Sequence, residues 1–334
     1  MILSDIATIK KNLFKGSCDF DKTALALFYF QYKNNQVYRD FIDTLHIDPQ
    51  SVTNINAIPF LPIQFFKSKK ITTTIFKPEL VFESSGTTTT INSKHYVKEL
   101  ALYEESFMKG FSMFYDNPSQ WCILGLLPSY LERKNSSLVY MVDRLIKASN
   151  HNKSGFYLNN FEELANTLQQ LEKEGQKTLL IGVTFALLDF AASYSIPLKH
   201  TIVMETGGMK GRKEEVLREE VHAKLKQSFG EGAVHSEYGM TELLSQAYSN
   251  GEGLFLTPPW MKVFLRDIQD PLSVIVAPHS GVTRGIINIV DLANIYSCSF
   301  IATDDLGVLH ADGRFEVLGR VSNSDLRGCS LLAV

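Results

Sequence analysis

The sequence of 334 residues lacks the features that mark secreted, membrane-spanning and nucleic-acid-binding proteins. Its four cysteines, Cys18, Cys122, Cys298 and Cys329, match no zinc or disulfide spacing, which indicates reduced thiols in a cytoplasmic protein. The N-terminus has no continuous apolar segment of the signal-peptide type. With 33 basic and 36 acidic residues and a net charge of -3, the chain lacks the basic excess that a nucleic-acid partner requires.

The chain also has no apolar run long enough to cross a bilayer. The most apolar stretch, residues 179–192, is shorter than a membrane-spanning helix and contains Asp189. We interpret it as a buried strand followed by a helix, and we expect no transmembrane segment. Hydrophobic residues make up 45% of the chain, which is enough for a sizeable core and excludes disordered and fibrous classes.

Strand-like and helical segments alternate through the middle of the chain. The beginning, to about residue 48, is predicted to be helical, with apolar and aromatic residues at helical spacing over 24–45. The two prolines in 58–66 predict an irregular or extended segment. Apolar runs predict buried strands at 80–82, 121–128, 178–183 and 201–205, and helices are expected at 96–115 and 160–175. This alternation is typical of an α/β fold with layered sheets.

The character of the sequence changes near residue 250, where strands become shorter and turns such as 311–313 appear. We therefore divide the chain into a helical segment with an α/β body (1–250), a β-rich subdomain (251–318) and a short C-terminal tail (319–334). No linker rich in glycine, serine or proline separates these parts, so we expect one compact body.

The first candidate motif is the hydroxyl-rich run FESSGTTTT at residues 82–90. Ser84, Ser85, Thr87 and Thr88 supply hydroxyl donors, and Gly86 permits close approach of a ligand. Successive backbone N–H groups in such a loop can bind a polyphosphate. The run is not a Walker A loop, because no second glycine with a following lysine stands at the required spacing. A polar turn or a helix N-cap is the alternative interpretation.

The run YGMTE at residues 238–242 combines groups that suit a nucleotide. Tyr238 can stack on an aromatic ring, Gly239 frees the backbone, and Met240 belongs to the same run. Thr241 supplies a hydroxyl, and Glu242 supplies a carboxylate of the hard type that Mg²⁺ prefers. The alternative interpretation is a strand end followed by a helix that Thr241 caps.

Two further runs complete the set of candidates. The pair Gly207–Gly208 follows a predicted strand and either lets a flat ligand approach the backbone or makes a tight turn. In the run TDDLG, Asp304 or Asp305 could accept hydrogen bonds from both vicinal hydroxyls of a ribose. The alternative interpretation of this run is a β-turn. Arg320 could pair with a phosphate or a hydroxyl.

In this order and combination, the motifs SSGTT, GG, YGMTE, TDDLG and GR…RG resemble those of the adenylate-forming superfamily. SSGTT resembles its phosphate loop, with Thr89 where a glycine is usual. YGMTE matches its adenine and magnesium motif without change. In TDDLG, Asp304 replaces the usual glycine, so the ribose-binding position falls on Asp305. The resemblance extends from about residue 58 to the C-terminus.

Within this superfamily the chain is most similar to the acyl-protein synthetase (LuxE-type) branch. The segment IPFLPIQFFK, the short length and the ending RGCSLL carry that similarity. The resemblance implies the superfamily's large-domain fold without its mobile C-terminal domain and lysine, because only six residues follow Gly328.

The resemblance implies ATP- and Mg²⁺-dependent activation of a carboxylic acid, expected to be a fatty acid. The product would be an acyl-adenylate whose acyl group passes to a thiol. ATP phosphates would lie over residues 84–88. Tyr238 and the Gly207–Gly208 turn would enclose the adenine, Asp305 with Arg320 nearby would hold the ribose, and Glu242 would hold Mg²⁺.

The acceptor thiol could be an internal cysteine, CoA or a carrier phosphopantetheine. In the LuxE-type branch it is a cysteine near the C-terminus, and Cys329 is its match here, with a buried structural cysteine as the alternative interpretation. The resemblance thus assigns Thr241, Glu242 and Cys329 to catalysis, and places His235 beside the acyl group. It also implies a partner protein that donates or accepts the acyl group. Two alternatives remain: an acyl- or aryl-CoA ligase related to phenylacetate-CoA ligases, and a nucleotide-binding protein without catalytic activity.

Overall fold

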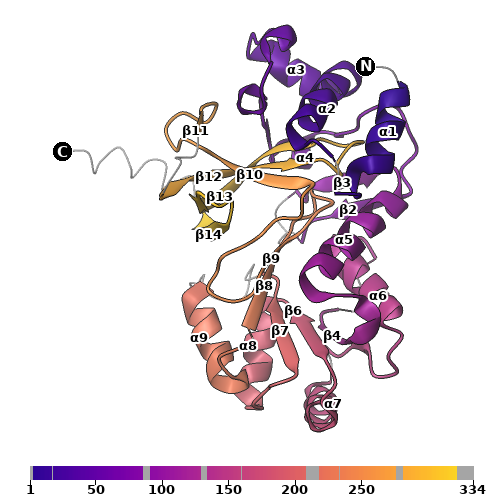
Figure 1. Cartoon of the computed structure of the whole chain (residues 1–334), viewed down its shortest axis with the longest axis vertical. Helices are drawn as coiled ribbons and strands as arrows, with labels where there is room; N and C mark the ends of the chain where they lie inside the picture. Colours follow the sequence, from indigo (N-terminus) through magenta and orange to yellow (C-terminus); the bar gives the residue numbers. More distant parts are fainter. Residues whose placement is uncertain are drawn as a thin grey trace, which may run out of the picture.

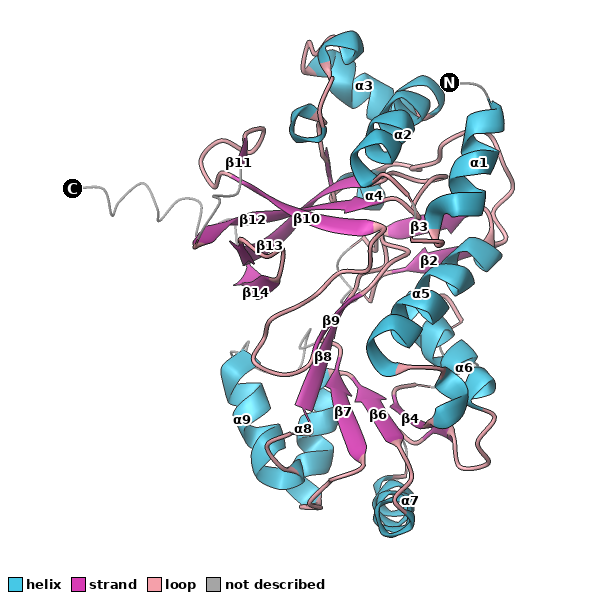
Figure 2. Ribbon diagram, viewed as in Figure 1, coloured by secondary structure: helices cyan, strands magenta, loops and turns pink. Residues whose placement is uncertain are grey.

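Three sheets organise the described part of the chain (Figure 1). The computed structural model describes residues 3–16, 18–85, 91–128, 134–158, 160–207, 218–232, 234–275 and 281–321. The N-terminal helices lie beside one large sheet, and the later helices lie beside the other (Figure 2). The result is a mixed α/β fold, as the alternation of segments predicted.

The helical beginning contains α1 (Leu3–Leu13), α2 (Phe20–Asn34) and α3 (Gln36–Thr44). The helical spacing over 24–45 is confirmed, with a break at Asn35. This residue has an extended backbone (φ -114°, ψ 104°), and its side-chain oxygen accepts a hydrogen bond from the Tyr38 N–H at 3.2 Å. Asn35 therefore ends α2 and caps α3.

The segment with two prolines is extended at its centre, as predicted. Short turns of 3-10 helix precede it, at Pro49–Ser51 and Ile55–Ala57, and β1 (Leu61–Pro62) is followed by α4 (Phe65–Ser68). β1 pairs in parallel with β13 (Phe300–His310), with Leu61 opposite Ile301. The segment thereby attaches the N-terminal helices to the sheet that contains β13.

Sheet 1 is mostly antiparallel, with the order β1-β13-β12-β10-β11 and β14 also paired to β13. Its other strands are β10 (Met261–Arg266), β11 (Val274–Ile275), β12 (Val282–Asp291), β13 (Phe300–His310) and β14 (Phe315–Arg320). Thr303, Asp304 and Asp305 lie within β13, so the β-turn alternative for TDDLG is wrong.

Sheet 2 has the order β5-β4-β6-β7-β8-β9 and is parallel except at β9. Its strands are β4 (Cys122–Leu126), β5 (Gly155–Phe156), β6 (Thr178–Gly182), β7 (Thr201–Glu205), β8 (Val234–Tyr238) and β9 (Ala247–Ser249). The apolar stretch 179–192 forms β6 and then a helix, as predicted. No helix in the described ranges is long and apolar enough to cross a membrane.

Helices cover both faces of sheet 2, which explains why its strands are continuous apolar runs. One face packs on α5 (Leu100–Tyr115) and α6 (Ser137–Ser149), with a 3-10 turn at Pro118–Gln120 between them. The other face packs on α7 (Phe161–Glu174), α8 (Thr184–Ser193) and α9 (Arg218–Phe229).

A separate hairpin joins β2 (Leu80–Glu83) to β3 (Lys94–Val97). The helix expected from Tyr96 is wrong at its start, because Tyr96 lies in β3 and α5 begins at Leu100. Pairing with β2 outweighs the local helical pattern, since His95 and Val97 point into the core from this strand. The hydroxyl-rich run is thus the connection between two paired strands.

The buried carboxylate of Asp291, at the end of β12, binds the chain that follows YGMTE. It accepts hydrogen bonds from the backbone N–H groups of Leu244 at 2.8 Å and Ser245 at 3.1 Å. It also accepts from the Ser245 hydroxyl at 2.6 Å and the Ala293 N–H at 3.1 Å. Sheet 1 thereby fixes the position of residues 244–245.

We expect Asp291→Asn to lower the free energy of unfolding by about 3 kcal/mol, because the amide nitrogen cannot accept the hydrogen bonds that one carboxylate oxygen accepts. Chemical denaturation would measure the loss. Asp267→Asn, at an exposed turn, is the matched control and should change stability much less. Equal stability losses in the two variants would contradict the role of Asp291.

Candidate active site

The carboxyl ends of β6, β7 and β8 meet at one edge of sheet 2. In sheets of this kind, ligands bind outside the carboxyl ends of the parallel strands. Within sheet 2, β8 and β9 extend toward the strands of sheet 1 (Figures 1 and 2). Three of the candidate motifs are at this edge: Gly207 follows β7, YGMTE begins at the end of β8, and TDDLG approaches from β13.

Tyr238, Asp305 and Arg320 come together between the two sheets. The Tyr238 hydroxyl donates to Asp305 Oδ2 at 2.7 Å, and Arg320 Nε donates to Asp305 Oδ1 at 3.3 Å. Asp305 and Arg320 are direct partners in the β13–β14 ladder. Burial, together with the Asp305 charge, holds the pKa of Tyr238 well above its usual range. The phenol therefore remains an uncharged donor.

Asp304 does not share this position, because successive strand residues point to opposite faces. Its Oδ1 accepts a hydrogen bond from Gln64 Nε2 at 2.6 Å, on an exposed surface. Of the two aspartates considered from the sequence, Asp305 is the one that lies beside Tyr238.

The backbone of Thr241 and Glu242 is held by side chains from distant segments. His95 Nδ1–H donates to the Thr241 carbonyl at 2.8 Å, and Asn294 Nδ2 donates to the Glu242 carbonyl at 2.7 Å. Residues 241–242 form a turn rather than a helix start, so the alternative in which Thr241 caps a helix is wrong. The Glu242 side chain is 5% exposed.

His95 is a neutral imidazole at physiological pH. Burial lowers its pKa to about 4, and the carbonyl that it contacts can only accept a proton. The proton therefore lies on Nδ1 and faces Thr241. Since His95 belongs to β3, it connects the strand that follows the hydroxyl-rich run to the YGMTE turn.

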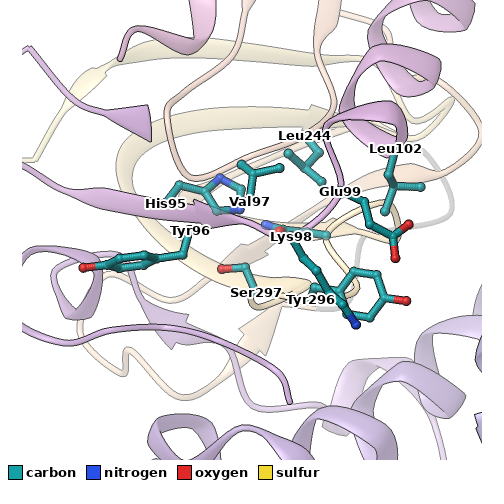
Figure 3. Close-up of a pocket in the computed structure, with 10 residues that line it drawn as sticks. His95, Tyr96, Val97, Lys98, Glu99, Leu102, Leu244, Tyr296 and Ser297 are labelled. Carbon is teal, nitrogen blue, oxygen red and sulfur yellow. The ribbon is translucent and has the colours of Figure 1, made fainter. Parts of the chain in front are cut away.

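A small pocket lies next to this connection. His95, Leu244 and Tyr296 are among its lining residues (Figure 3). Its interior has room for about one water molecule. The pocket is too small for a nucleotide and serves as part of the packing behind the turn.

Gly207 and Gly239 are needed for different structural reasons. Gly207 adopts a positive φ of 73°, and its N–H donates to Glu205 Oε1 at 2.6 Å. Gly239 leaves room for the Glu237 carboxylate, because a Cβ there would force that carboxylate to move. Its role is to make space beside Glu237 rather than to adopt a positive φ.

The remaining predicted residues are placed only in part. Ser84 lies near the start of the hydroxyl-rich run, and its Oγ accepts a hydrogen bond from the Ser93 N–H at 2.9 Å. This bond connects the two ends of the segment between β2 and β3. Ser85 is exposed, and Met240 is half-buried. Five predicted residues lie outside the described residues: Gly86, Thr87, Thr88, Gly208 and Cys329.

Arg218, at the start of α9, is a site residue that sequence reasoning missed. Its guanidinium lies 4.8 Å from the centroid of the Phe255 ring and donates to the Val317 carbonyl at 3.3 Å. Burial lowers the pKa of the Arg218 guanidinium. The nearby Glu205, Tyr238 and Asp305 act in the opposite direction and raise it. In the sequence it stands in a run of mixed charges, 210–220, and nothing there distinguishes it from a surface arginine.

Comparison with solved structures shows the class of fold. MatB from Rhodopseudomonas palustris, solved with ATP bound, matches with a TM-score of 0.52 at 18% identity over 74% of this chain and 50% of its own. A long-chain-fatty-acid-CoA ligase from Archaeoglobus fulgidus matches with a TM-score of 0.51 at 15% identity over 76% of this chain and 53% of its own. The fold thus partly matches the large domain of adenylate-forming enzymes, and the chain spans about half the length of these structures.

Comparison of sequences shows the family. The family described as acyl-protein synthetase, LuxE, matches residues 15–333, and the chain belongs to it. A long-chain-fatty-acid–luciferin-component ligase from Aliivibrio fischeri is 22% identical over 337 aligned positions, which cover 93% of this chain and 86% of the relative. The resemblance drawn from the motifs is therefore confirmed at the level of the family.

We expect His95 to destabilise the folded protein as the pH falls from about 6.5 to 4. Over this range the unfolded chain protonates His95 and the folded chain does not, so His95 lowers the free energy of unfolding by about 3 kcal/mol. Burial lowers the pKa of His235 to about 4 as well, so the difference between the wild type and His95→Gln isolates one group. His46→Gln, at an exposed turn, is the control. Parallel pH profiles of unfolding for the wild type and His95→Gln would contradict this account.

Proposed function

We propose that this protein uses ATP to activate a carboxylic acid as an acyl-adenylate and then transfers the acyl group to a thiol. Membership in the LuxE family supports acyl activation in general. The observation that carries the proposal is the convergence of Tyr238, Asp305 and the turn bearing Glu242 at the carboxyl ends of β7 and β8. This edge offers a carboxylate for ribose hydroxyls and an aromatic ring for adenine.

The fit of Asp305 to a ribose can be judged from its hydrogen bonds. Each of its oxygens has one protein donor, Tyr238 on one side and Arg320 on the other. A carboxylate has about four acceptor positions, so capacity remains for two vicinal hydroxyls. Arg320 is 56% exposed along its side chain and is free to shift toward a phosphate.

In the first step, a carboxylate oxygen of the acid attacks the α-phosphorus of ATP. The bond from that phosphorus to the bridging oxygen breaks, and pyrophosphate leaves. Both reactants are anions, so positioning and charge neutralisation supply most of the catalysis. We assign the phosphates to the loop over residues 84–88 and the nucleoside to Tyr238, Gly207 and Asp305.

Mg²⁺ bound at Glu242 would neutralise phosphate charge. Among the described residues, no group of three or more His, Cys, Asp and Glu side chains could hold a metal ion. A magnesium ion here would take most of its oxygen ligands from the phosphates and water, with Glu242 as the protein's contribution. That donor set is what a nucleotide-bound magnesium ion usually has.

In the second step, a thiolate attacks the acyl carbonyl and AMP leaves, so that a thioester forms. Burial raises the pKa of Cys122 to about 11 and that of Cys298 to about 12, which leaves these thiols protonated and unreactive. Cys18 is partly exposed, with its Sγ 2.9 Å from Thr23 Oγ1. We propose Cys329 as the acceptor, a long-chain fatty acid as the substrate, and a partner protein that exchanges the acyl group.

We expect Glu242→Gln to reduce acid-dependent ATP–pyrophosphate exchange by roughly 100-fold, because the amide removes the charge that would hold Mg²⁺ and leaves the shape unchanged. Unfolding curves should show that the variant still folds. Glu105→Gln, which loses only a surface ion pair with Lys109, is the matched control. Exchange at the wild-type rate in Glu242→Gln would remove Glu242 from the reaction.

Incubation with ATP, Mg²⁺ and a long-chain fatty acid should leave a labelled thioester that neutral hydroxylamine releases. Cys329→Ser should abolish the label and keep pyrophosphate exchange, because the adenylate forms before the thiol acts. Cys18→Ser is the control and should keep both. A label that persists in Cys329→Ser, or efficient acyl-CoA formation with no label, would show that a different thiol is the acceptor.

A further inference from the structure

A group of polar side chains on the α5 face of sheet 2 has no part in the steps above. This polar cluster consists of Glu237, Tyr248, Tyr115 and His235. Glu237 on β8 and Tyr248 on β9 are direct partners in the ladder, so their side chains lie on the same face. The Tyr115 ring on α5 lies 5.4 Å from the Tyr248 ring, between centroids.

The members of the polar cluster differ in whether they have hydrogen-bond partners. Tyr115 and His235 are hydrogen-bonded to each other, with 3.2 Å between the hydroxyl and Nδ1. The Tyr248 hydroxyl is fully buried and has no partner among the described residues. The Glu237 side chain is 7% exposed, and no hydrogen bond joins its carboxyl to another described residue. Unpaired buried groups are rare and costly, so the Tyr248 hydroxyl, beside Glu237 on one face of the sheet, requires an explanation.

The charge state of the polar cluster defines what it could bind. Burial, and then the charge of Glu205, raise the pKa of Glu237 to about 8, so its carboxyl is mostly neutral at pH 7. Glu205 is itself satisfied, because Thr184 and Gly207 donate to it and Arg218 lies nearby. The open groups are therefore an uncharged carboxyl and a phenol, each able to donate and to accept.

The position of the polar cluster relates it to the acid substrate. Glu237 directly precedes Tyr238, whose hydroxyl binds Asp305, and its carboxyl lies against Gly239 of the same motif. The acid must lie close to this motif in order to reach the α-phosphorus. The neighbouring side chains are largely apolar, with the Phe114 ring 5.2 Å from that of Tyr248. Such surroundings suit a hydrocarbon chain with one polar group.

We propose that Glu237 and Tyr248 select an acid that carries a hydroxyl group on its chain. The inference rests on the proposed function and names the class of its substrate. A hydroxyl both donates and accepts, so it can pair with the two open groups at once, whereas an unsubstituted chain leaves both unpaired. Glu237 and Tyr248 are then residues that determine specificity.

ATP–pyrophosphate exchange with a panel of acids tests this proposal. The panel contains one straight-chain fatty acid, the same acid with a hydroxyl at its second, third or last carbon, and the corresponding amino-substituted acid. We expect kcat/KM for at least one hydroxy acid to exceed that for the unsubstituted acid by about tenfold or more. The preference should shrink in Glu237→Leu and in Tyr248→Phe, and remain in Glu237→Gln, which keeps an uncharged hydrogen-bonding group.

Tyr38→Phe is the matched control, because the Tyr38 hydroxyl is buried but donates to the Pro59 carbonyl at 2.6 Å. Its melting temperature should fall while its preference among acids is unchanged, whereas Tyr248→Phe should keep its melting temperature. If Glu237→Leu does not fold, the preference for hydroxy acids measured in Tyr248→Phe decides whether the proposal holds.

Three outcomes would overturn the hydroxyl preference. Equal use of hydroxy and unsubstituted acids would mean that the polar cluster holds only a structural water. A preference for the amino-substituted acid would mean that it binds a cation. If no acid of the panel supported exchange in the wild type, the proposed function itself would be refuted. This result is distinguishable from the other two because every acid-dependent signal would then be missing.

Discussion

The turn between Thr241 and Ser245 depends on side chains that bind its backbone from elsewhere in the fold. His95 from the β2–β3 hairpin binds the Thr241 carbonyl, and Asn294 binds the Glu242 carbonyl. Asp291 from sheet 1 accepts from the next backbone N–H groups. These bonds are buried, where hydrogen bonds are strong and an unmet partner is costly. The turn has therefore little freedom, and Glu242 stands at a defined place.

This constraint connects the parts that a nucleotide would touch. β3 begins at Lys94, shortly after the hydroxyl-rich run ends at residue 90, and the bond from His95 connects this strand to the turn with Glu242. Asp305 and Tyr238 make the corresponding connection between sheets 1 and 2. The positions proposed for phosphate, metal and ribose thus lie on three separate segments that are connected by these hydrogen bonds. Such preorganisation is what charge neutralisation in a transition state requires.

Much of this could be predicted from local sequence patterns. The strands of sheet 2 are apolar throughout because helices cover both faces, and the groups proposed to bind a nucleotide in YGMTE and TDDLG are adjacent in the sequence. The supporting residues could not be predicted, because His95 contacts a carbonyl 146 residues away and any buried histidine would look the same in the sequence. The local pattern places Tyr96 in a helix because cross-strand pairing with β2 is invisible locally. Nothing in the sequence distinguishes Glu237, because only the fold shows that its carboxyl is buried.

A crystal structure with a non-hydrolysable acyl-adenylate, in which a sulfamate replaces the phosphate, tests the central claim most directly. The account predicts ribose hydroxyls on Asp305, adenine between Tyr238 and the turn at Gly207, and the sulfamate facing Glu242 and the loop over residues 84–88. An adenylate bound elsewhere, with the Tyr238–Asp305 edge unoccupied, would contradict it.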